Sequence, residues 1–569
     1  MWRVLSIVAV AAVVAACGAP PADQAAASDR SVPAVLSAPG AHQLPLADLT
    51  AAIAARVVAA PAAAAEAGDL AALYTSTGQM PLWLDGRGHP SRQAVAAMAL
   101  LADAATEGLA PADYGSDVLD AQGRTLRDAG AGDADALARF DVDLSLGVLR
   151  FLRHLHVGRI DPRTIGFRLD VPPDDHGFAA VVASAVADDR LAEAVAELRP
   201  ALRLYEPLRE ALAGYRARAQ QEEAAEVFPA PARPVKPGEA YAGTAQVARR
   251  LAALGDLAAG TMPSAEADVY DGPVVEAVRR FQLRHGLESD GVLGAGTLTA
   301  LAVPLRWRVR QIELALERLR WLPHLTEGRV VFVNIPMFHL WAWDRLSATD
   351  LPAFDTDIIV GRALGTETPV FIEDMRYVVF RPYWNVPPSI LRGEILPRLA
   401  RDPGYLARER MEIVWGQGDN ATPVELTPEN LALLRTGALR VRQRPGTHNA
   451  LGLVKFMFPN QDNVYLHGTP AQSLFSRARR DFSHGCVRVA NPAGLAAWVL
   501  AGQPGWTAAA IDAAMTRGAD SRVVNLAQPV QVILTYVTAV VWPGEETVRF
   551  APDIYEHDRR LDEALAARR

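Results

Sequence analysis

Apolar residues are spaced differently in the first and last parts of the chain. From about residue 70 to residue 221 they recur every three or four positions, which predicts amphipathic helices because this spacing places them on one helix face. The clearest stripe consists of Phe140, Leu144, Val148, Phe151 and Leu155. The same spacing over 305–321 predicts one more helix.

Short strands replace the helices after about residue 329. Apolar runs bounded by Gly and Pro lie at 330–336, 340–343, 357–361, 377–380, 453–458, 464–467, 523–526 and 530–537. Several short strands of this kind predict a β-sandwich or a partly open barrel. A stretch of helical and loop character, about 387–439, interrupts them. It is too long for a turn, so we interpret it as an insertion or lid over a site.

Proline and glycine mark the boundaries between these regions. The segment 222–240 has repeated prolines, which stiffen a chain without letting it pack and so predict an interdomain linker. The pattern over 241–303, after this segment, predicts a turn, a helix ended by Gly, a second turn and a short helix. The predicted fold is therefore multidomain α+β. Its parts are a helical domain at 69–221, the linker, a small helical domain at 241–303, a connecting helix at 304–328, a mainly-β domain at 329–540 and a tail at 541–569.

The N-terminus has the pattern of an export signal. Arg3 is followed by an apolar run from Val4 to Ala16, which is too short to span a bilayer as a mature helix. We therefore predict a signal peptide at 1–16. Residues 17–68 are rich in Ala and Pro, which predicts a tether with helical character from Leu46 onward.

The composition supports folded domains and argues against one class of function. The chain has 569 residues, too many for one compact core, and its 50% hydrophobic content allows most of it to bury cores. A formal net charge of −8 argues against a nucleic-acid-binding protein, which usually carries a basic face. The sequence has no metal-ligand spacing, phosphate-binding loop or dinucleotide fingerprint.

The strongest chemical signal surrounds Cys486, in the run Ser483-His484-Gly485-Cys486-Val487-Arg488-Val489. Upstream lies His467, in Tyr465-Leu466-His467-Gly468-Thr469-Pro470. A cysteine attacks a carbonyl well only as a thiolate, so it needs a base or a cation beside it. His467 can accept the thiol proton, and its imidazolium then stabilises the thiolate. Gly485 lets the backbone bend close to a substrate, and the amides of Gly485 and Cys486 are candidates for an oxyanion hole.

Structural explanations compete with the catalytic one. An isolated Cys is most often a small buried hydrophobic residue, and a lone His at a strand end is usually structural. Cys17 and Cys486 are the only cysteines, so no disulfide framework is expected. An unpaired Cys in a Ser-His-Gly-Cys loop of an exported protein favours catalysis. His154 and His156 lie on different faces of a predicted helix and are interpreted as ordinary polar positions.

The motifs around His467 and Cys486 resemble the catalytic domain of the L,D-transpeptidase family, also called the YkuD domain. The resemblance covers about 329–537 and includes the runs that start at Val331, Ile359, Thr368 and Phe380. The spelling from Phe281-Gln282 through Asp290-Gly291 to Thr297 resembles the three-helix peptidoglycan-binding domain. With the helical region in front, this order is similar to the YcbB-like Gram-negative subgroup, which has a scaffold domain and a capping insertion.

This resemblance implies roles for individual residues. Cys486 matches the nucleophile and His467 the proton acceptor, whose second nitrogen is oriented by a backbone carbonyl, with Gly468 as the candidate. His484 matches a second histidine with a structural or supporting role, and Arg488 a position that contacts a substrate carboxylate or fixes the loop. Further candidates for substrate binding are Ser483 and Gly485 in the loop, and Tyr383, Trp384 and Asn385 before the lid.

The resemblance also implies a reaction. Cys486 would attack the meso-diaminopimelate carbonyl of a donor tetrapeptide stem and release D-Ala, and the amine of an acceptor stem would resolve the thioester into a 3→3 cross-link. Carbapenem inhibitors would acylate the same thiol, and no cofactor is expected. Two alternatives stay open. One is hydrolysis of the acyl-enzyme by a carboxypeptidase or endopeptidase, and the other is a non-catalytic wall-binding lipoprotein that acts through 241–303.

Val14-Ala15-Ala16-Cys17 resembles the lipobox of bacterial lipoproteins, in which the cysteine thiol is lipidated and becomes the new N-terminus. Gly18 follows it rather than Asp, which implies sorting to the outer membrane. The alternative is an ordinary cleaved signal peptide with a chance cysteine. We therefore expect a periplasmic protein, anchored to outer-membrane lipid through Cys17, with peptidoglycan stem peptides as partners.

Overall fold

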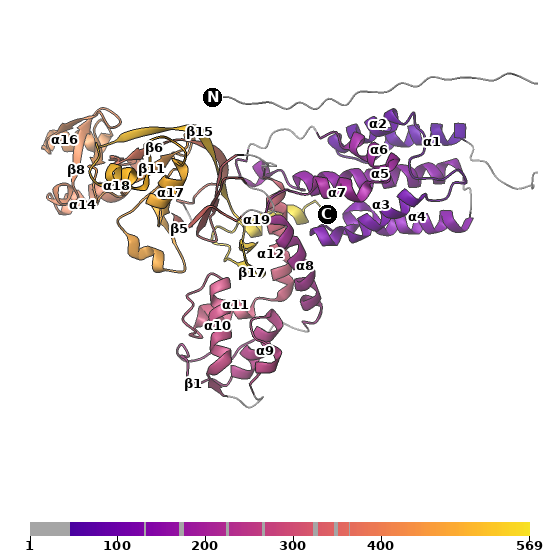
Figure 1. Ribbon diagram of the computed structural model, residues 1–569, viewed down its shortest axis with the longest axis horizontal. Helices are drawn as coiled ribbons and strands as arrows, with labels where there is room; N and C mark the ends of the chain where they lie inside the picture. The colour runs from indigo at the N-terminus through magenta and orange to yellow at the C-terminus, as the bar shows by residue number, and fades with distance from the viewer. Residues whose placement is uncertain are drawn as a thin grey trace, which may run out of the picture. The chain divides into compact units, whose positions relative to one another are not determined.

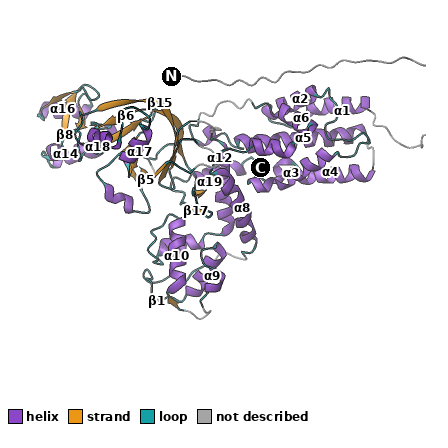
Figure 2. Cartoon of the chain, in the orientation of Figure 1, coloured by secondary structure: helices purple, strands orange, loops and turns teal. Residues whose placement is uncertain are grey.

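The structure is a computed structural model that describes residues 46–129, 133–169, 176–222, 227–263, 268–322, 328–345, 351–363 and 365–568. Helices dominate the first part of the chain and strands the last part, so the predicted multidomain α+β class is confirmed (Figures 1 and 2). None of the helices in these ranges has the length and apolar character that a membrane crossing needs. The predicted signal peptide and Cys17 lie outside the described residues.

The scaffold domain is built around one central helix, α5. Its helices are α1 (Leu46–Ala59), α2 (Ala64–Ser76), α3 (Arg92–Ala102), α4 (Ser116–Ala129), α5 (Ala134–Val157), α6 (Phe178–Ala187), α7 (Leu191–Leu198) and α8 (Tyr205–Gln220), with the 3-10 turns η1 (Asp103–Glu107), η2 (Pro111–Tyr114) and η3 (Pro162–Ile165). Helix α5 is 24 residues long and is buried on most of its circumference, because α1, α2, α3, α4 and α6 all pack against it. The predicted apolar stripe from Phe140 to Leu155 is buried there.

The scaffold begins earlier than the sequence indicated. Leu49 and Ile53 of α1 are fully buried in the same apolar core as Phe140. Glu66 of α2 accepts an ion pair from Arg150 of α5 at 2.8 Å. Residues 46–68 are therefore part of the folded domain and not of the tether that we expected. Their alanine-rich composition, which suggested a tether, equally suits helices that pack closely.

A small three-helix domain follows. Its elements are β1 (Glu239–Ala240), α9 (Thr244–Leu254), η4 (Ala259–Thr261), β2 (Val269–Tyr270), α10 (Gly272–Arg284) and α11 (Ala295–Ala302), with β1 and β2 antiparallel. The motif residue Gln282 is buried, and its amide nitrogen donates to the carbonyl of Val292 and to Thr297 at 3.0 and 3.1 Å. This part of the motif therefore stabilises the domain rather than contacting a ligand.

The proline-rich segment 227–240 packs against this domain instead of forming a free linker. Val235 is buried, and its amide and carbonyl bond the carbonyl and amide of Leu293 at 3.2 and 2.9 Å. Proline lacks an N–H, but Val235 keeps its own and can still pair as a strand does. The expected linker is thus partly an element of the three-helix domain.

The mainly-β domain contains a nine-stranded sheet. Its strands are β3 (Val330–Asn334), β4 (His339–Trp343), β5 (Phe354–Gly361), β6 (Phe371–Phe380), β11 (Val454–Met457), β12 (Leu466–His467), β13 (Asp481–Ser483), β14 (Val487–Val489) and β15 (Arg522–Thr535). Their order is β13-β5-β14-β12-β11-β6-β15-β3-β4, and β4 also pairs with β5. This last pairing joins distant parts of the sheet, which agrees with the predicted barrel-like arrangement. The short helices η6 (Gln472–Ser476), α17 (Pro492–Val499) and α18 (Ala508–Thr516) belong to the same domain.

The predicted insertion has its own sheet and core. Its strands are β7 (Trp384–Asn385), β8 (Met411–Trp415), β9 (Thr422–Val424) and β10 (Arg440–Gln443), and its helical segments are α13 (Pro388–Ile390), η5 (Leu391–Ile395), α14 (Leu396–Arg401), α15 (Tyr405–Arg408) and α16 (Pro428–Thr436). The sheet order is β7-β10-β8-β9, and Ile395, Leu399 and Leu434 are buried in a separate apolar cluster. The insertion therefore spans 384–443, slightly more than expected, and contains strands where we expected helix and loop.

The C-terminal segment is folded and is not the tail that we expected from residue 541. Strand β16 (Ala539–Val541) pairs with β17 (Val548–Phe550), and α19 (His557–Ala566) packs against α12 (Leu305–Arg320). Asp558 is fully buried, forms an ion pair with Arg318 and accepts from the Thr538 hydroxyl at 2.6 Å. Leu561 and Leu565 belong to the apolar core of the mainly-β domain. The charged outer face of α19 hid this packing in the sequence.

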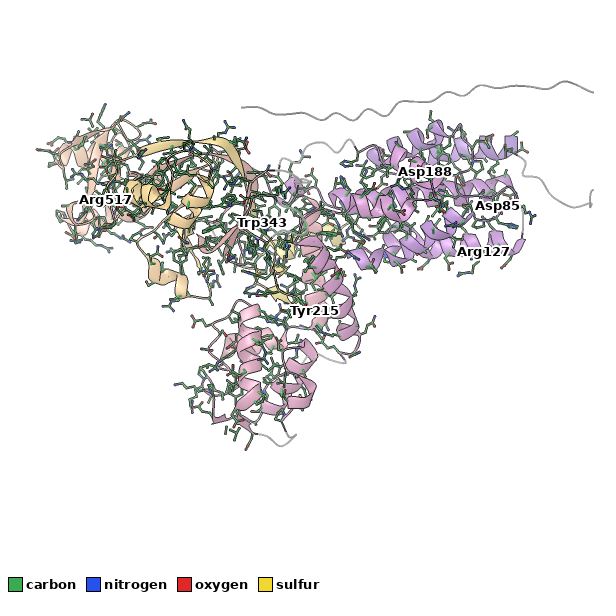
Figure 3. The ribbon with its side chains drawn as sticks, viewed as in Figure 1. Asp85, Arg127, Asp188, Tyr215, Trp343 and Arg517 are labelled. Carbon is green, nitrogen blue, oxygen red and sulfur yellow. The ribbon has the colours of Figure 1, made fainter. Side chains whose placement is uncertain are left out.

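Arg284 connects three parts of the structure. It lies buried at the end of α10 and binds Asp256 of its own domain at 2.7 Å. It donates to the hydroxyl of Tyr215 on α8, labelled in Figure 3, and to the carbonyl of Val548 on β17, both at 3.1 Å. One guanidinium therefore bonds the three-helix domain to the scaffold and to the C-terminal hairpin.

Candidate active site

The pairing of β12 with β14 brings the two sequence motifs together. The strands are parallel, and His467 lies opposite Arg488. In the same register Tyr465 is opposite Cys486, and the amide of Val487 donates to the Tyr465 carbonyl at 3.1 Å. Because side chains alternate between the two faces of a strand, Tyr465, His467, Cys486 and Arg488 share one face of the sheet.

A small pocket of about 80 Å³ lies over this face. It is lined from the sheet and its loops by Ala450, Leu451, Tyr465, His467, Ser483, His484, Cys486 and Arg488, and from the capping insertion by Trp384, Pro387 and Ile390. Pockets for drug-sized ligands usually have about 300–1,000 Å³. The pocket in this arrangement is thus smaller than the usual range for a drug-sized ligand.

His467 is held as a neutral imidazole. Its side chain is 4% exposed, and its Nδ1 donates to the carbonyl of Gly468 at 2.5 Å. This bond leaves Nε2 as the basic nitrogen. Burial lowers the pKa of His467 to about 3, and the charges of Arg488 and Lys455 also lower it. The Gly468 carbonyl thus lies where the sequence placed it, next to the second imidazole nitrogen.

The Cys486 thiol is also neutral at rest. Burial raises its pKa, although hydrogen bonds from Tyr465 and the nearby charges of Arg488 and Lys455 act in the opposite direction. The sequence indicated a thiolate beside an imidazolium, whereas the structure favours a neutral thiol and a neutral imidazole. The reason is desolvation, because a pocket walled by Trp384 and other apolar groups disfavours both charges.

The Ser-His-Gly-Cys loop is closed by its own serine. The Ser483 hydroxyl donates to the Cys486 carbonyl at 2.5 Å and accepts from the Gly485 amide at 3.2 Å. Gly485 has φ +110°, a backbone conformation that favours glycine. Its amide is engaged, so it does not serve the oxyanion role that we expected of it. The Cys486 amide has no acceptor within the described ranges and is still available for that role.

Thr368 and Tyr555, which were not among the predicted site residues, hold this loop through hydrogen bonds. The Thr368 hydroxyl donates to the Gly485 carbonyl at 2.8 Å and accepts from the Gly361 amide at 2.9 Å. The Tyr555 hydroxyl accepts from the Thr368 amide at 3.3 Å and donates to the Gly361 carbonyl. Thr368 begins one of the sequence runs that resemble the family. Tyr555 lies in the segment expected to be a tail, and no sequence pattern marks it as part of the site.

We expect Tyr555→Phe to slow acylation of the Cys486 thiol about tenfold, since a small displacement of the Ser-His-Gly-Cys loop is costly. Tyr555 is a positioning residue, so the rate of thiol acylation by meropenem should fall while the melting temperature changes little. Tyr241→Phe is the control, because it removes another single hydroxyl bond, at 2.8 Å to the Pro229 carbonyl, far along the chain from the loop. Equal acylation rates in both variants would contradict this role.

His484 contacts the capping insertion. Its Nε2 lies 2.8 Å from the carboxylate of Glu394, which is on η5. The insertion is also bonded to the core where Ser521 donates to Asp419. The predicted supporting histidine therefore links the nucleophile loop to the segment that covers the pocket.

The residues expected before the lid separate into two groups. Trp384 lines the pocket. Tyr383 instead lies under the guanidinium of Arg442, 4.2 Å from its ring centre, and Asn385 donates to Asp419 at 3.1 Å. Tyr383 and Asn385 are not among the residues that line the pocket. The physical reason is strand alternation in β7, which turns neighbouring side chains to opposite faces.

Three family comparisons match successive parts of the chain. Residues 68–212 match the family described as "Scaffold domain", residues 242–301 that described as "Putative peptidoglycan binding domain", and residues 328–507 the L,D-transpeptidase catalytic domain, YkuD. Since the pocket and both motifs lie within the third match, the chain contains an L,D-transpeptidase catalytic domain preceded by a scaffold and a peptidoglycan-binding domain.

The chain is similar to a protein of Haemophilus influenzae named "Putative L,D-transpeptidase", with 33% identity over 254 residues. The alignment covers 44% of this chain and 49% of that protein, so the chain spans about half the length of the curated relative it matches. Among solved structures, an L,D-transpeptidase fragment (residues 123–326) of Xylanimonas cellulosilytica is 17% identical. It covers 54% of this chain and 100% of its own, with a TM-score of 0.16.

Proposed function

We propose that the chain is a cysteine-dependent L,D-transpeptidase that forms 3→3 cross-links between peptidoglycan stem peptides. The observation that supports this most is the parallel register of β12 and β14, which puts Cys486 and His467 on one face of one pocket. A thiol and a neutral imidazole in one pocket are the groups that acyl transfer through a thioester needs, although the thiol at rest donates to the Asn463 carbonyl at 3.7 Å. The matched catalytic and peptidoglycan-binding domains supply the substrate class.

In the proposed acylation, the Cys486 sulfur attacks the carbonyl of meso-diaminopimelate in a donor tetrapeptide stem. His467 Nε2 takes the thiol proton as the C–S bond forms, so no ion pair needs to exist beforehand. The Cys486 amide faces the developing oxyanion. The C–N bond to D-Ala then breaks, His467 returns the proton to the leaving amine, and a thioester is left on Cys486.

In the proposed second step, the side-chain amine of an acceptor stem attacks the thioester. His467 accepts a proton from this amine and returns it to the Cys486 sulfur when the C–S bond breaks. The capping insertion supports transfer over hydrolysis if it covers the thioester once the acceptor is bound, because a covered site excludes competing water. Arg488 lines the pocket without an ion-pair partner in the described part of the chain, so we assign it to a stem-peptide carboxylate.

Location and inhibition are part of the same proposal. Substrates in the cell wall require a protein of the cell envelope, and we propose that lipidation of Cys17 anchors it to the outer membrane from the periplasmic side. Carbapenems should acylate Cys486, because a strained lactam carbonyl replaces the stem-peptide carbonyl in the first step.

Product analysis tests the proposal. The purified chain is incubated with disaccharide-tetrapeptide, and the products are separated and identified by mass spectrometry. Dimers joined through two diaminopimelate residues, with one D-Ala released per link, are the expected products. Tripeptide monomers and D-Ala without dimers would replace the proposal with a carboxypeptidase. Intact-mass analysis after meropenem treatment should show one adduct, and peptide mapping should locate it on Cys486.

A further inference from the structure

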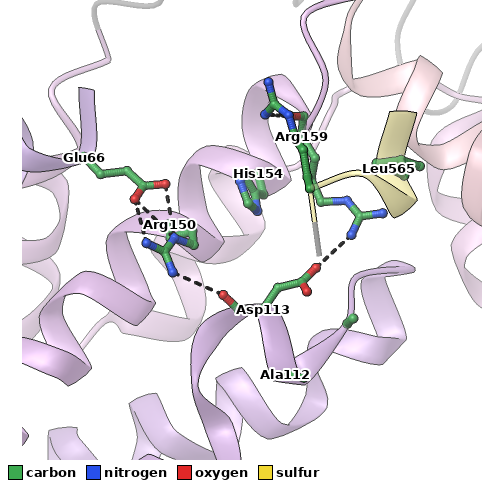
Figure 4. A pocket seen from close by; sticks show the side chains of 9 residues that line it. Glu66, Ala112, Asp113, Arg150, His154, Arg159 and Leu565 are labelled. Atoms are coloured by element: carbon green, nitrogen blue, oxygen red, sulfur yellow. Dashed lines mark hydrogen bonds and ion pairs between the residues drawn. The ribbon is translucent and has the colours of Figure 1, made fainter. Parts of the chain in front are cut away.

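A second and larger cavity, of about 670 Å³, lies in the scaffold domain and shares no lining residue with the Cys486 pocket. It is formed by α2, the turn η2, helix α5 and the end of α19 (Figure 4). Its charged and polar lining consists of Glu66, Asp113, Arg150, His154, Arg159 and Arg568. Its volume lies in the range of about 300–1,000 Å³ that is common for ligand pockets.

The cavity has an excess of positive charge. Three guanidinium groups face two carboxylates, and both carboxylates are already engaged (Figure 4). Glu66 accepts from Arg150 at 2.8 Å, and Asp113 accepts from Nη1 of Arg159 at 2.8 Å. Arg568 has no carboxylate partner within the described residues and donates only to the carbonyl of Arg159. Among the residues that line the cavity, positive charges thus exceed negative charges by one, and Glu317, which pairs with Arg159, lies outside this lining.

The cavity also contains hydrogen-bond donors, on Arg159 and His154, that a ligand could use. Arg159 is 8% exposed, and its Nε makes no hydrogen bond in the described ranges, although the Glu317 carboxylate lies 3.9 Å away. His154 is held neutral because burial lowers its pKa to about 3, with a smaller contribution from the arginines. Its Nδ1 lies 3.1 Å from the Tyr114 hydroxyl, which donates to it if Nε2 carries the proton. The Nε2–H then adds a neutral donor to the cavity.

We propose that this cavity binds a carboxylate-bearing ligand, at a site separate from the transpeptidase centre. A buried guanidinium with free N–H groups is costly unless an acceptor completes it, and carboxylates match guanidinium groups in geometry and charge. Arg568 and Arg159 supply the charge, and His154 supplies a third donor. Stem peptides of the wall and small dicarboxylates share this chemistry, so both are candidate sources of the ligand.

Titration calorimetry on the full-length chain tests the site with three probes, which are glutarate, disaccharide-tetrapeptide and inorganic phosphate. The chain carries Cys486→Ala in every titration, so that the tetrapeptide is not consumed. We expect saturable binding of at least one carboxylate, weakened at least tenfold by Arg568→Gln and by higher salt. Arg560→Gln is the matched control, because Arg560 is an exposed arginine of α19, the helix that precedes Arg568, and does not line the cavity.

The possible results distinguish between the two candidate ligands and also show when the proposal is wrong. Binding of both carboxylates shows that a small dicarboxylate suffices, and binding of tetrapeptide alone identifies the stem peptide. Arg568 is exposed near the chain end, so its substitution should leave the melting temperature unchanged. The proposal is overturned if neither carboxylate binds, if phosphate binds more tightly than both, or if Arg568→Gln binds as well as the parent. None of these results depends on transpeptidase activity.

Discussion

Cys486→Ala is expected to abolish cross-link formation and D-Ala release, with a loss of about 1,000-fold or more in kcat/KM. The reason is that the proposed reaction passes through a thioester on this sulfur, and alanine offers no atom that could carry the acyl group. Dimer formation from disaccharide-tetrapeptide, followed by mass spectrometry, measures the effect. Meropenem should no longer form an adduct with the variant.

The matched control for Cys486→Ala is wall binding. The peptidoglycan-binding domain at 242–301 does not include the pocket, so the variant should sediment with purified peptidoglycan as the parent chain does. Cross-linking by the alanine variant at the parent rate would refute the nucleophile. A parent chain that binds the wall but produces neither dimers nor D-Ala would favour the non-catalytic alternative.

His467→Ala should have the second largest effect, a loss of about 100-fold to 10,000-fold in kcat. The structure predicts a pH profile that is unusual for histidine. Burial lowers the pKa of His467 to about 3, so the neutral, basic form persists well below the ordinary value of 6.5. The acid side of the kcat/KM profile should therefore not fall near pH 6.5. Rates measured from pH 4 to pH 8 with a stable donor check this expectation.

His484→Ala is the comparison for His467→Ala. His484 also lines the pocket, but its Nε2 pairs with Glu394 of the capping insertion. We therefore do not assign it to the transfer of the Cys486 thiol proton. Its loss should reduce activity less than the loss of His467. Equal turnover by the parent chain and His467→Ala would remove His467 as the base, and a normal histidine inflection near pH 6.5 would contradict its buried neutral state.

Much of the local structure follows from short-range patterns. The stripe from Phe140 to Leu155 predicted the buried helix α5, because helical spacing gathers apolar side chains irrespective of what they later contact. The β3–β4 hairpin and the three helices of the small domain were predictable for the same local reason. Gly485 could be interpreted as a bend near the nucleophile, and its φ of +110° agrees.

Composition gave wrong predictions for two segments whose packing partners are distant in sequence. The alanine-rich composition of residues 46–68 predicts a tether, yet α1 is buried against α5. The segment after 541 has a charged surface, but Asp558 is buried beside Arg318, which lies far upstream. Tyr555, which supports the nucleophile loop through Thr368, was hidden by the same error.

The amino-acid order alone selected Cys486 and His467 as candidates and placed the Gly468 carbonyl next to His467, because these residues lie within two short motifs. Only the tertiary structure shows that Cys486 and His467 share a pocket. This depends on the parallel pairing of β12 with β14, a contact between strands that no local pattern encodes. The protonation states of His467 and Cys486 could also be predicted only from the tertiary structure. Desolvation by burial makes both groups neutral, and burial is a property of three-dimensional packing.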